Sequence, residues 1–536
     1  MSSRKPILVL IALMALIAST TAAVAFAAPA EIAFHPAPGE PHDYRVGMRV
    51  QVDGGKRSSS GQWLALQSVM RYRVNANGPA LKMHVEPRFM QAENEERILL
   101  SSAQPSAPEY GPVARLMNTG FELTIARESG ATQLEAGDRK AWQAIAEQTD
   151  VPLEQLGQLI LAPAVVRNIP ADKGAQVTIE HFHGMPALHL TVERVDRDSV
   201  TATIVRAADT AAATQAHSAH AGNTPVTSVH GRLRIDRSSG WIKAMTLISD
   251  RQVARAGRTE RLHSVVTMRA VDDPATGSMY DSLQVFKTNA MQAALAGYDM
   301  YLPKTAADAP ERPVIDTPEN PLADAETAFH IDNEHGALVL DIRHHNGENI
   351  RIDQPTLDAL TLRDANGKAL DIGFVLESIG RDYDKKSTSR IHLLALDGHR
   401  APLSDIAEVE ATFTYLPVGA PTYVTLPLRD IATELEHGPA HAEALPIQNG
   451  WLVTLTGTYT TYYTYDNTAV FKGSSAITSD RPDNGMAPTD QALLDSVDDP
   501  DTWIQQYQIE GDVDAFALAL YPAQGKATTH ELTFTR

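Results

Sequence analysis

The chain has 536 residues, of which 43% are hydrophobic and 21% charged, and its formal net charge is −20. This length corresponds to about three or four domains, and the composition excludes a collagen-like, coiled-coil or wholly disordered protein. Cysteine is absent from the sequence, which excludes disulfides, thiolate zinc sites, iron–sulfur clusters and cysteine nucleophiles.

The N-terminal residues have the pattern of an export signal. Arg4 and Lys5 form a basic start, residues 7–18 are all apolar, and Ala25 and Ala27 form a small-x-small cleavage site. As a helix the apolar run would rise about 18 Å, which is too short for a bilayer core of about 30 Å. We therefore predict a signal peptide over residues 1–27, a periplasmic or secreted mature chain, and no transmembrane span after cleavage.

Charge is distributed unevenly along the chain. Residues 28–273 contain 27 basic and 27 acidic residues, whereas residues 274–536 contain 17 basic and 39 acidic ones. This division indicates domains with different surfaces and argues against nucleic-acid binding, which needs a concentrated positive field. Residues 232–269 are locally basic, and the alternate spacing of Arg232 and Arg234 favours the solvent-facing side of a strand over a patch for an anionic ligand.

Residues 40–273 are predicted to form a large, curved, antiparallel β domain. Short β-rich runs alternate with turn residues at hairpin spacing, for example residues 69–74 and 81–87 around the turn 75–78. Similar turns stand at residues 127–130, 196–198 and 237–240, where Gly, Asn and Asp accept the backbone angles of tight turns.

Two or three helices are predicted beside this sheet. Asp138 can cap a helix over residues 139–148, in which Trp142 and Ile145 form an apolar stripe, and Asp150 can cap a second helix that ends before Pro163. Residues 207–222 are rich in Ala, Thr and His and are predicted to be a mobile insertion between strands. Residues 274–326 combine a third candidate helix with an acidic, proline-rich linker.

Residues 327–430 and 440–536 are predicted to be two immunoglobulin-like β-sandwich modules. Each begins with a strand after an Asn/Gly turn, continues with a variable middle, and ends with two strands around a Pro/Gly turn. The closing strands are residues 412–415 and 423–426 in the first copy, and residues 516–520 and 528–534 in the second. The pattern recurs over about 100 residues, which is the size of an immunoglobulin-like sandwich.

The run Gly231-Arg-Leu-Arg-Ile-Asp236, followed by Ser239-Gly240-Trp-Ile242, resembles a hairpin of envelope proteins with curved sheets. With a neutral β domain ahead of two sandwich modules, the chain resembles uncharacterised exported β-rich proteins of Gram-negative bacteria. The resemblance implies an envelope location, and some of these curved-sheet proteins carry lipids or lipoproteins. It transfers no functional residue to this sequence.

Motifs of common enzymes are absent, since the sequence contains no nucleophile elbow, zincin, P-loop or dinucleotide-binding pattern. The best metal candidates are His181 and His183, which would point to one face of a strand, with His189 as a third ligand. No acidic residue stands at a diagnostic spacing from them, so exposed strand histidines are the favoured interpretation.

A second metal candidate lies near the C-terminus. Asp498, Asp499 and Asp501 offer carboxylate oxygens in a loop, which suit Ca²⁺. Their spacing does not match the pattern of a calcium-binding loop of the EF-hand kind, so a solvated acidic loop is favoured.

A tyrosine-rich run offers the only aromatic binding candidate that the pattern indicates. Tyr459, Tyr463 and Tyr465 would share one face of a strand, where they could stack on sugar rings or contact a protein. The favoured interpretation is cross-strand pairing that stabilises the sheet.

Three functions are compatible with these features. The first is a non-catalytic, exported binding or scaffolding protein of the bacterial envelope, with an envelope protein, a glycan or an apolar ligand as partner. The second is a carrier that encloses a lipid or another apolar ligand between the curved sheet and the helices. The third is a metal-dependent hydrolase that uses His181 and His183 or scattered carboxylates. No cofactor is predicted beyond the candidate Ca²⁺ or transition metal.

Overall fold

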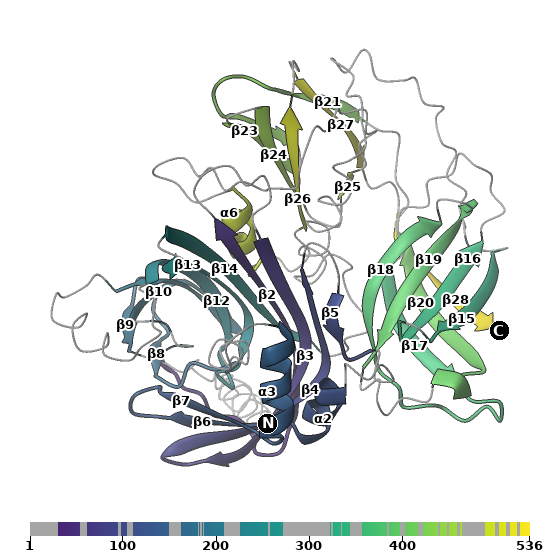
Figure 1. Cartoon of the computed structure of the whole chain (residues 1–536). Helices are drawn as coiled ribbons and strands as arrows, with labels where there is room; N and C mark the ends of the chain where they lie inside the picture. Colours follow the sequence, from purple (N-terminus) through teal and green to yellow (C-terminus); the bar gives the residue numbers. More distant parts are fainter. Residues whose placement is uncertain are drawn as a thin grey trace, which may run out of the picture.

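The computed structural model of the chain is mainly β, with one large curved sheet and smaller β units beside it (Figure 1). It confirms the mainly β fold class that turn spacing and strand patterns predict. The structure describes residues 31–53, 62–94, 98–103, 111–149, 162–180, 182, 185, 187–207, 226–255, 258–271, 322, 325–333, 335–343, 356–382, 385–396, 403–415, 422–437, 440–447, 450–457, 461–463, 488–498, 503–510, 515–522 and 526–536. The predicted signal peptide and the insertion at residues 207–222 lie largely or wholly outside these ranges, as do the predicted second and third helices.

Twelve strands form one antiparallel sheet in the order β7-β6-β4-β3-β2-β14-β13-β12-β11-β10-β9, with β5 paired to β4. Because β2 pairs with β14, the beginning and the end of the predicted domain meet at the middle of the sheet. The strands are β2 (Pro41–Asp53), β3 (Gln62–Asn77), β4 (Ala80–Asn94), β5 (Ile98–Ser101), β6 (Phe121–Ala126), β7 (Thr132–Ala136), β9 (Gln176–Ile179), β10 (Leu188–Val195), β11 (Ser199–Arg206), β12 (Val226–Asp236), β13 (Ile242–Arg255) and β14 (Arg258–Val271).

The two faces of this sheet differ because side chains alternate along each strand. Tyr44 and Val46 of β2 point to the same side as Met245 and Leu247 of β13, and we call this side the inner face. The opposite side, which carries Thr246 of β13, is the outer face. The inner-face residues belong to one continuous hydrophobic core that includes residues from β3, β4, β6 and β9 to β14.

The ends of the sheet do not meet by hydrogen bonding, since no pairing between the described strands β7 and β9 closes it into a barrel. A two-stranded sheet of β1 (Glu31–Ile32) and β8 (Ile169–Pro170) accompanies it. Helix α3 (Arg139–Thr149) begins after Asp138, whose carboxylate accepts a hydrogen bond from the Ala141 amide at 2.9 Å, as the sequence predicts. Helix α2 (Gly111–Thr119) is not among the predicted helices, because its buried side chains, Val113, Leu116 and Met117, span little more than one helical turn.

A β-sandwich follows the large sheet in the chain. One layer is the sheet β15-β16-β19-β18 and the other is β17-β20-β28. Leu340 and Ile391 of the first layer share a hydrophobic core with Phe413 and Phe534 of the second. The elements are β15 (Glu326–Asp332), β16 (Ala337–Arg343), β17 (Thr356–Arg363), β18 (Phe374–Asp382), β19 (Lys385–Ala395), η3 (Leu403–Asp405), β20 (Glu408–Tyr415) and β28 (Thr528–Thr535).

A further β unit lies between β20 and β28 in the sequence. It consists of the sheets β21-β27-β25 and β22-β23-β24-β26. Helix α6 (Pro488–Asp495) lies between this unit and the large sheet (Figure 1). The strands are β21 (Thr422–Pro427), β22 (Thr433–His437), β23 (Ala440–Ile447), β24 (Gly450–Gly457), β25 (Thr461–Tyr463), β26 (Trp503–Glu510) and β27 (Ala515–Pro522).

The strand pairing differs from the two closing hairpins that the internal repeat predicts. Strand β28 pairs with β20 along its whole length, and β27 pairs with β21. The last strand of the chain therefore completes the first sandwich, where the rings of Phe534 and Phe413 pack edge to face at 6.4 Å. The two copies have similar alternating patterns, and such a pattern specifies the buried face of a strand without specifying its partner.

The sandwich docks on the outer face of the large sheet. Val69 of β3 and Phe89 of β4 form a small hydrophobic core with Val339 of β16 and Leu394 of β19. At this contact Gly336 has a φ of +64°, and a Cβ atom there would overlap the carbonyl oxygen of Ala103. Only glycine permits so close an approach of the two backbones.

Candidate functional site

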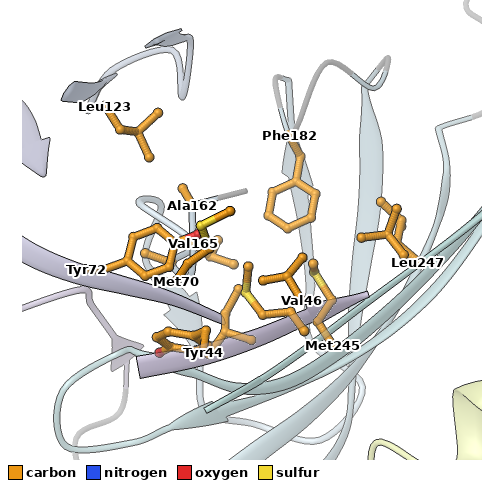
Figure 2. Close-up of a cluster of buried hydrophobic side chains, with 14 of the residues drawn as sticks. Tyr44, Val46, Met70, Tyr72, Leu123, Ala162, Val165, Phe182, Met245 and Leu247 are labelled. Atoms are coloured by element: carbon orange, nitrogen blue, oxygen red, sulfur yellow. The ribbon is translucent and has the colours of Figure 1, made fainter. Parts of the chain in front are cut away.

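The inner face of the large sheet is the most extensive apolar surface in the described structure. Figure 2 shows Tyr44, Met70 and Tyr72 on one side of it, Met245 and Leu247 on the other, and Phe182 above them. All of these side chains are buried, with at most 5% of their surface exposed. Methionine recurs on this face, and its flexible, polarizable side chain adapts to differently shaped apolar neighbours.

An aromatic cluster closes one end of the inner face. The Trp241 ring packs edge to face on Phe34 at 4.8 Å and lies 4.3 Å from the His42 ring, while the Tyr44 and Tyr72 rings meet edge to face at 5.5 Å. Burial raises the pKa of Tyr44 well above its ordinary value. The Tyr44 hydroxyl is fully buried and has no hydrogen-bond partner among the described residues.

The hairpin between β12 and β13 fixes this aromatic end. Burial acts to raise the pKa of Asp236, but hydrogen bonds from Lys243, Ser238 and Ser239 outweigh it and hold the pKa far below its usual range. Gly240 has a φ of +78°, and a Cβ atom there would lie 2.7 Å from the backbone of Phe34. The turn that the sequence predicts at residues 237–240 therefore packs closely against the backbone of the N-terminal segment.

A small pocket lies at the gap between the two ends of the sheet, and we call it the seam pocket. Ile125 and Thr132 line it from β6 and β7, Ile179 lines it from β9, and Phe182 follows β9. Residues 162–167, the cover segment, form its remaining wall. The cavity of about 20 Å³ has room for one water molecule.

Among the residues that the structure describes, few backbone hydrogen bonds hold the cover segment. Ala164 forms an isolated bridge with Trp241, and the Ile242 amide donates to the Pro163 carbonyl at 3.0 Å. The segment continues into β8, which pairs with the two residues of β1. Short elements of this kind open at a lower free-energy cost than the long strands beside them.

The arginines of the outer face form ion pairs with carboxylates from another part of the same chain. Arg232 of β12 forms ion pairs with Asp495 at 3.1 Å and with Asp498 at 2.6 Å, and Arg194 of β10 contacts Asp498 at 2.8 Å. The Thr246 hydroxyl donates to the Leu493 carbonyl of α6 at 2.9 Å. The basic stretch that the sequence places on a solvent-facing side is thus the binding surface for the acidic segment 488–498 of the same chain.

A buried histidine extends this contact. The His263 ring lies between two carboxylates, with Nδ1 2.9 Å from Asp250 and Nε2 3.3 Å from Asp490 of α6. Asp250 also accepts hydrogen bonds from Ser228 at 2.6 Å and from Arg261 at 3.1 Å. Every oxygen of Asp250 has a partner, which suits a structural link between the sheet and α6.

The predicted metal ligands fall into two groups. Asp498 is bound to Arg194 and Arg232, while Asp499 and Asp501 lie outside the described residues. His189 lies on β10, where its ring contacts the Thr178 hydroxyl at 3.1 Å. His181 and His183 lie outside the described residues. The part of the chain that the structure describes contains no group of three His, Asp or Glu side chains able to hold a metal.

The predicted tyrosine face is only partly within the structure. Tyr463 lies on β25, which pairs with β27 opposite Leu520. Tyr459 and Tyr465 lie outside the described residues. The grouping of these three tyrosines as a ligand-binding face stays a prediction.

The comparisons with known proteins give no family for this chain: no family model and no curated protein matches it. A solved structure of lipovitellin, described as showing lipid–protein interactions in lipovitellin, matches with a TM-score of 0.27 and 9% sequence identity. The match covers 51% of this chain and 32% of the lipovitellin chain. So low a similarity supports no argument about function, and the function must be inferred from the site. Within the described residues, no helix is long and apolar enough to cross a membrane.

The sequence patterns do not predict the residues that build the seam pocket and the inner face. The seam pocket depends on residues 162–167, which carry no periodic signal. The alternation of Met245 and Leu247 with Thr246 on β13 was visible in the sequence and would have separated the two faces of the sheet. It could not show that α6 covers one face, because α6 lies more than two hundred residues away in the chain.

Proposed function

We propose that this protein binds an apolar ligand, of the size of a lipid chain, against the inner face of its twelve-stranded sheet. One observation carries the proposal: the inner face is apolar from β6 to β9, and short segments cover it at the seam where a second sheet would cover it in an ordinary sandwich. Apolar concave surfaces at the mouths of barrels are common ligand sites.

The seam supports a route of entry in this proposal. The seam pocket opens between the two sheet edges, and its cover segment is tied down by few backbone bonds. Displacement of residues 162–167 would expose the pocket wall at Phe182 and the buried apolar side chains near it (Figure 2). The ligand would then replace contacts that the cover segment makes with the core.

The leader-like residues 1–27 support an exported location for this carrier as part of the same proposal. The scaffolding role that the modular sequence predicts is less well supported by the geometry. Much of the outer face, where a partner would dock on the large sheet, contacts α6 and the first sandwich of the same chain.

Titration of the full chain with N-phenyl-1-naphthylamine, a neutral apolar fluorophore, tests the proposal. We expect saturable binding with one site per chain. The variant Phe182→Ala should enlarge the pocket and change the affinity by about tenfold. Phe182 is 5% exposed, and the matched control Phe329→Ala removes a ring that is 4% exposed in the sandwich core.

The control should lower stability as Phe182→Ala does and leave the affinity for the fluorophore unchanged. Absence of saturable binding in both the natural chain and Phe182→Ala would overturn the proposal. An equal change in affinity in Phe329→Ala would also overturn it, because the probe would then report general loosening of the protein.

A further inference from the structure

Arg251 is a partly buried cation on the mainly apolar inner face. Strands β13 and β14 pair without interruption from Ala244 to Arg255, so Arg251 shares a face with Met245 and Leu247. Burial lowers the pKa of Arg251 from its ordinary value. Its guanidinium Nη2 lies 3.8 Å from the Met185 sulfur, and this weak acceptor is its hydrogen-bond partner in the structure.

The arginines of the outer face are in a different situation. Arg232 contacts the carboxylates of Glu193, Asp495 and Asp498, and Arg71 forms two hydrogen bonds with Asp43 at 2.8 Å. Arg251 has no carboxylate partner among the described residues. A partly buried charge without a counter-charge carries a desolvation cost, so Arg251 on the proposed ligand-binding face suits a ligand that supplies the anion.

Arg251 and the seam pocket are connected by one turn of the chain. Phe182 lines the pocket, and the Met185 amide donates a hydrogen bond to the Phe182 carbonyl at 2.9 Å. Met185 in turn contacts Arg251. Met185 therefore links the guanidinium to a residue that lines the seam pocket.

We propose that Arg251 binds the anionic head group of an amphiphilic ligand whose apolar chain lies on the inner face. This inference rests on the proposed function and adds the ligand class: a single-chain amphiphile with a carboxylate or phosphate head. The planar guanidinium donates two parallel hydrogen bonds to either group. The neighbouring methionines accommodate the chain without a rigid shape requirement.

Displacement of bound N-phenyl-1-naphthylamine by three competitors tests the inference in the full chain. Hexadecanoate, hexadecyl phosphate and the neutral hexadecan-1-ol have the same chain and differ in the head group. We expect one or both anions to bind roughly ten- to a hundredfold more tightly than the alcohol. The two anions distinguish a carboxylate from a phosphate ligand.

Substitutions of Arg251 test whether this side chain causes the preference for anionic competitors. Arg251→Gln should abolish the preference for anions and keep the affinity for the alcohol, while Arg251→Lys should retain part of it. Arg197, whose side chain is 95% exposed, provides the matched control Arg197→Gln, which should keep the full preference. Thermal unfolding of each variant reports whether the fold is intact.

The outcomes separate the two proposals. If the alcohol binds as tightly as both anions, or if Arg251→Gln keeps the preference, the head-group site is overturned and the apolar site stands. If neither the fluorophore nor any of the three competitors binds, both proposals fall. Loss of the preference in Arg251→Gln with its retention in Arg197→Gln supports the head-group site.

Discussion

The two faces of the large sheet are formed by the same strands, but different parts of the chain contact them. On the outer face, Arg194 and Arg232 meet carboxylates of the segment 488–498, and Val69 and Phe89 pack on the sandwich. On the inner face, Arg251 lacks a carboxylate partner in the described structure, and residues 162–167 provide a short cover. The chain thus supplies ionic partners for its outer face, whereas on the inner face we propose that a ligand supplies the anion for Arg251.

The contact between the sandwich and the outer face depends most strongly on Gly336. We expect Gly336→Ala to destabilise the docked state by about 3 kcal/mol or more, since it adds a clash with Ala103 to an unfavourable φ of +64°. Limited proteolysis and scanning calorimetry should show the sandwich unfolding separately from the sheet.

Gly367→Ala is the matched control for this glycine. Gly367 has a φ of +77°, and a Cβ atom there would meet nothing within 4 Å. It should show only the backbone penalty of about 1–2 kcal/mol that a non-glycine residue has at a positive φ. Equal losses in the two variants would show that the backbone angle, and not the close approach of the two units, explains the effect of Gly336→Ala.

The charged contact of α6 with the outer face depends on Arg232. We expect Arg232→Gln to cost about 1–3 kcal/mol at low salt, because it leaves Asp495 and Asp498 with fewer cations in a partly buried site. The cost should decrease at high salt. Hydrogen exchange in residues 488–498 should become faster, whereas Arg197→Gln should leave it unchanged; unaltered exchange in both variants contradicts the assignment.

The turn at the aromatic end gives a pH-dependent prediction. The pKa of Asp236 is held low in the folded state, so its carboxylate stabilises the fold at pH values above the unfolded pKa of about 3.9, and this contribution is lost as the pH falls toward the folded pKa. We expect Asp236→Asn to cost about 1–2 kcal/mol at neutral pH and progressively less as the solution is acidified.

Urea denaturation at several pH values measures this difference. Asp198→Asn, at a side chain that is 81% exposed, should show no such pH dependence. A cost for Asp236→Asn that stays constant down to pH 2 would falsify the assigned role of the carboxylate.

The smallest expected effect concerns the inner face itself. Tyr44→Phe removes a buried hydroxyl that has no hydrogen-bond partner, so we expect a gain in stability of about 0.5–1 kcal/mol in the absence of ligand. Chemical denaturation of the purified chain measures it. A loss of stability instead would show that the hydroxyl has a favourable interaction, and the inner face would then be more polar than its side chains indicate.

Local signals in the sequence determined much of the architecture. Alternating apolar residues and turns such as residues 237–240 predicted the antiparallel strands, and Asp138 predicted the start of α3. These features depend on neighbours within a few residues, so the sequence alone specifies them.

Only the tertiary structure decided which elements meet. The sequence could not show that β28 pairs with β20, that α6 neutralises Arg232, or that Arg251 contacts Met185. Each of these contacts joins residues far apart in the chain. Their selection depends on shared burial and loop closure across the whole molecule, and a local pattern does not encode either of them.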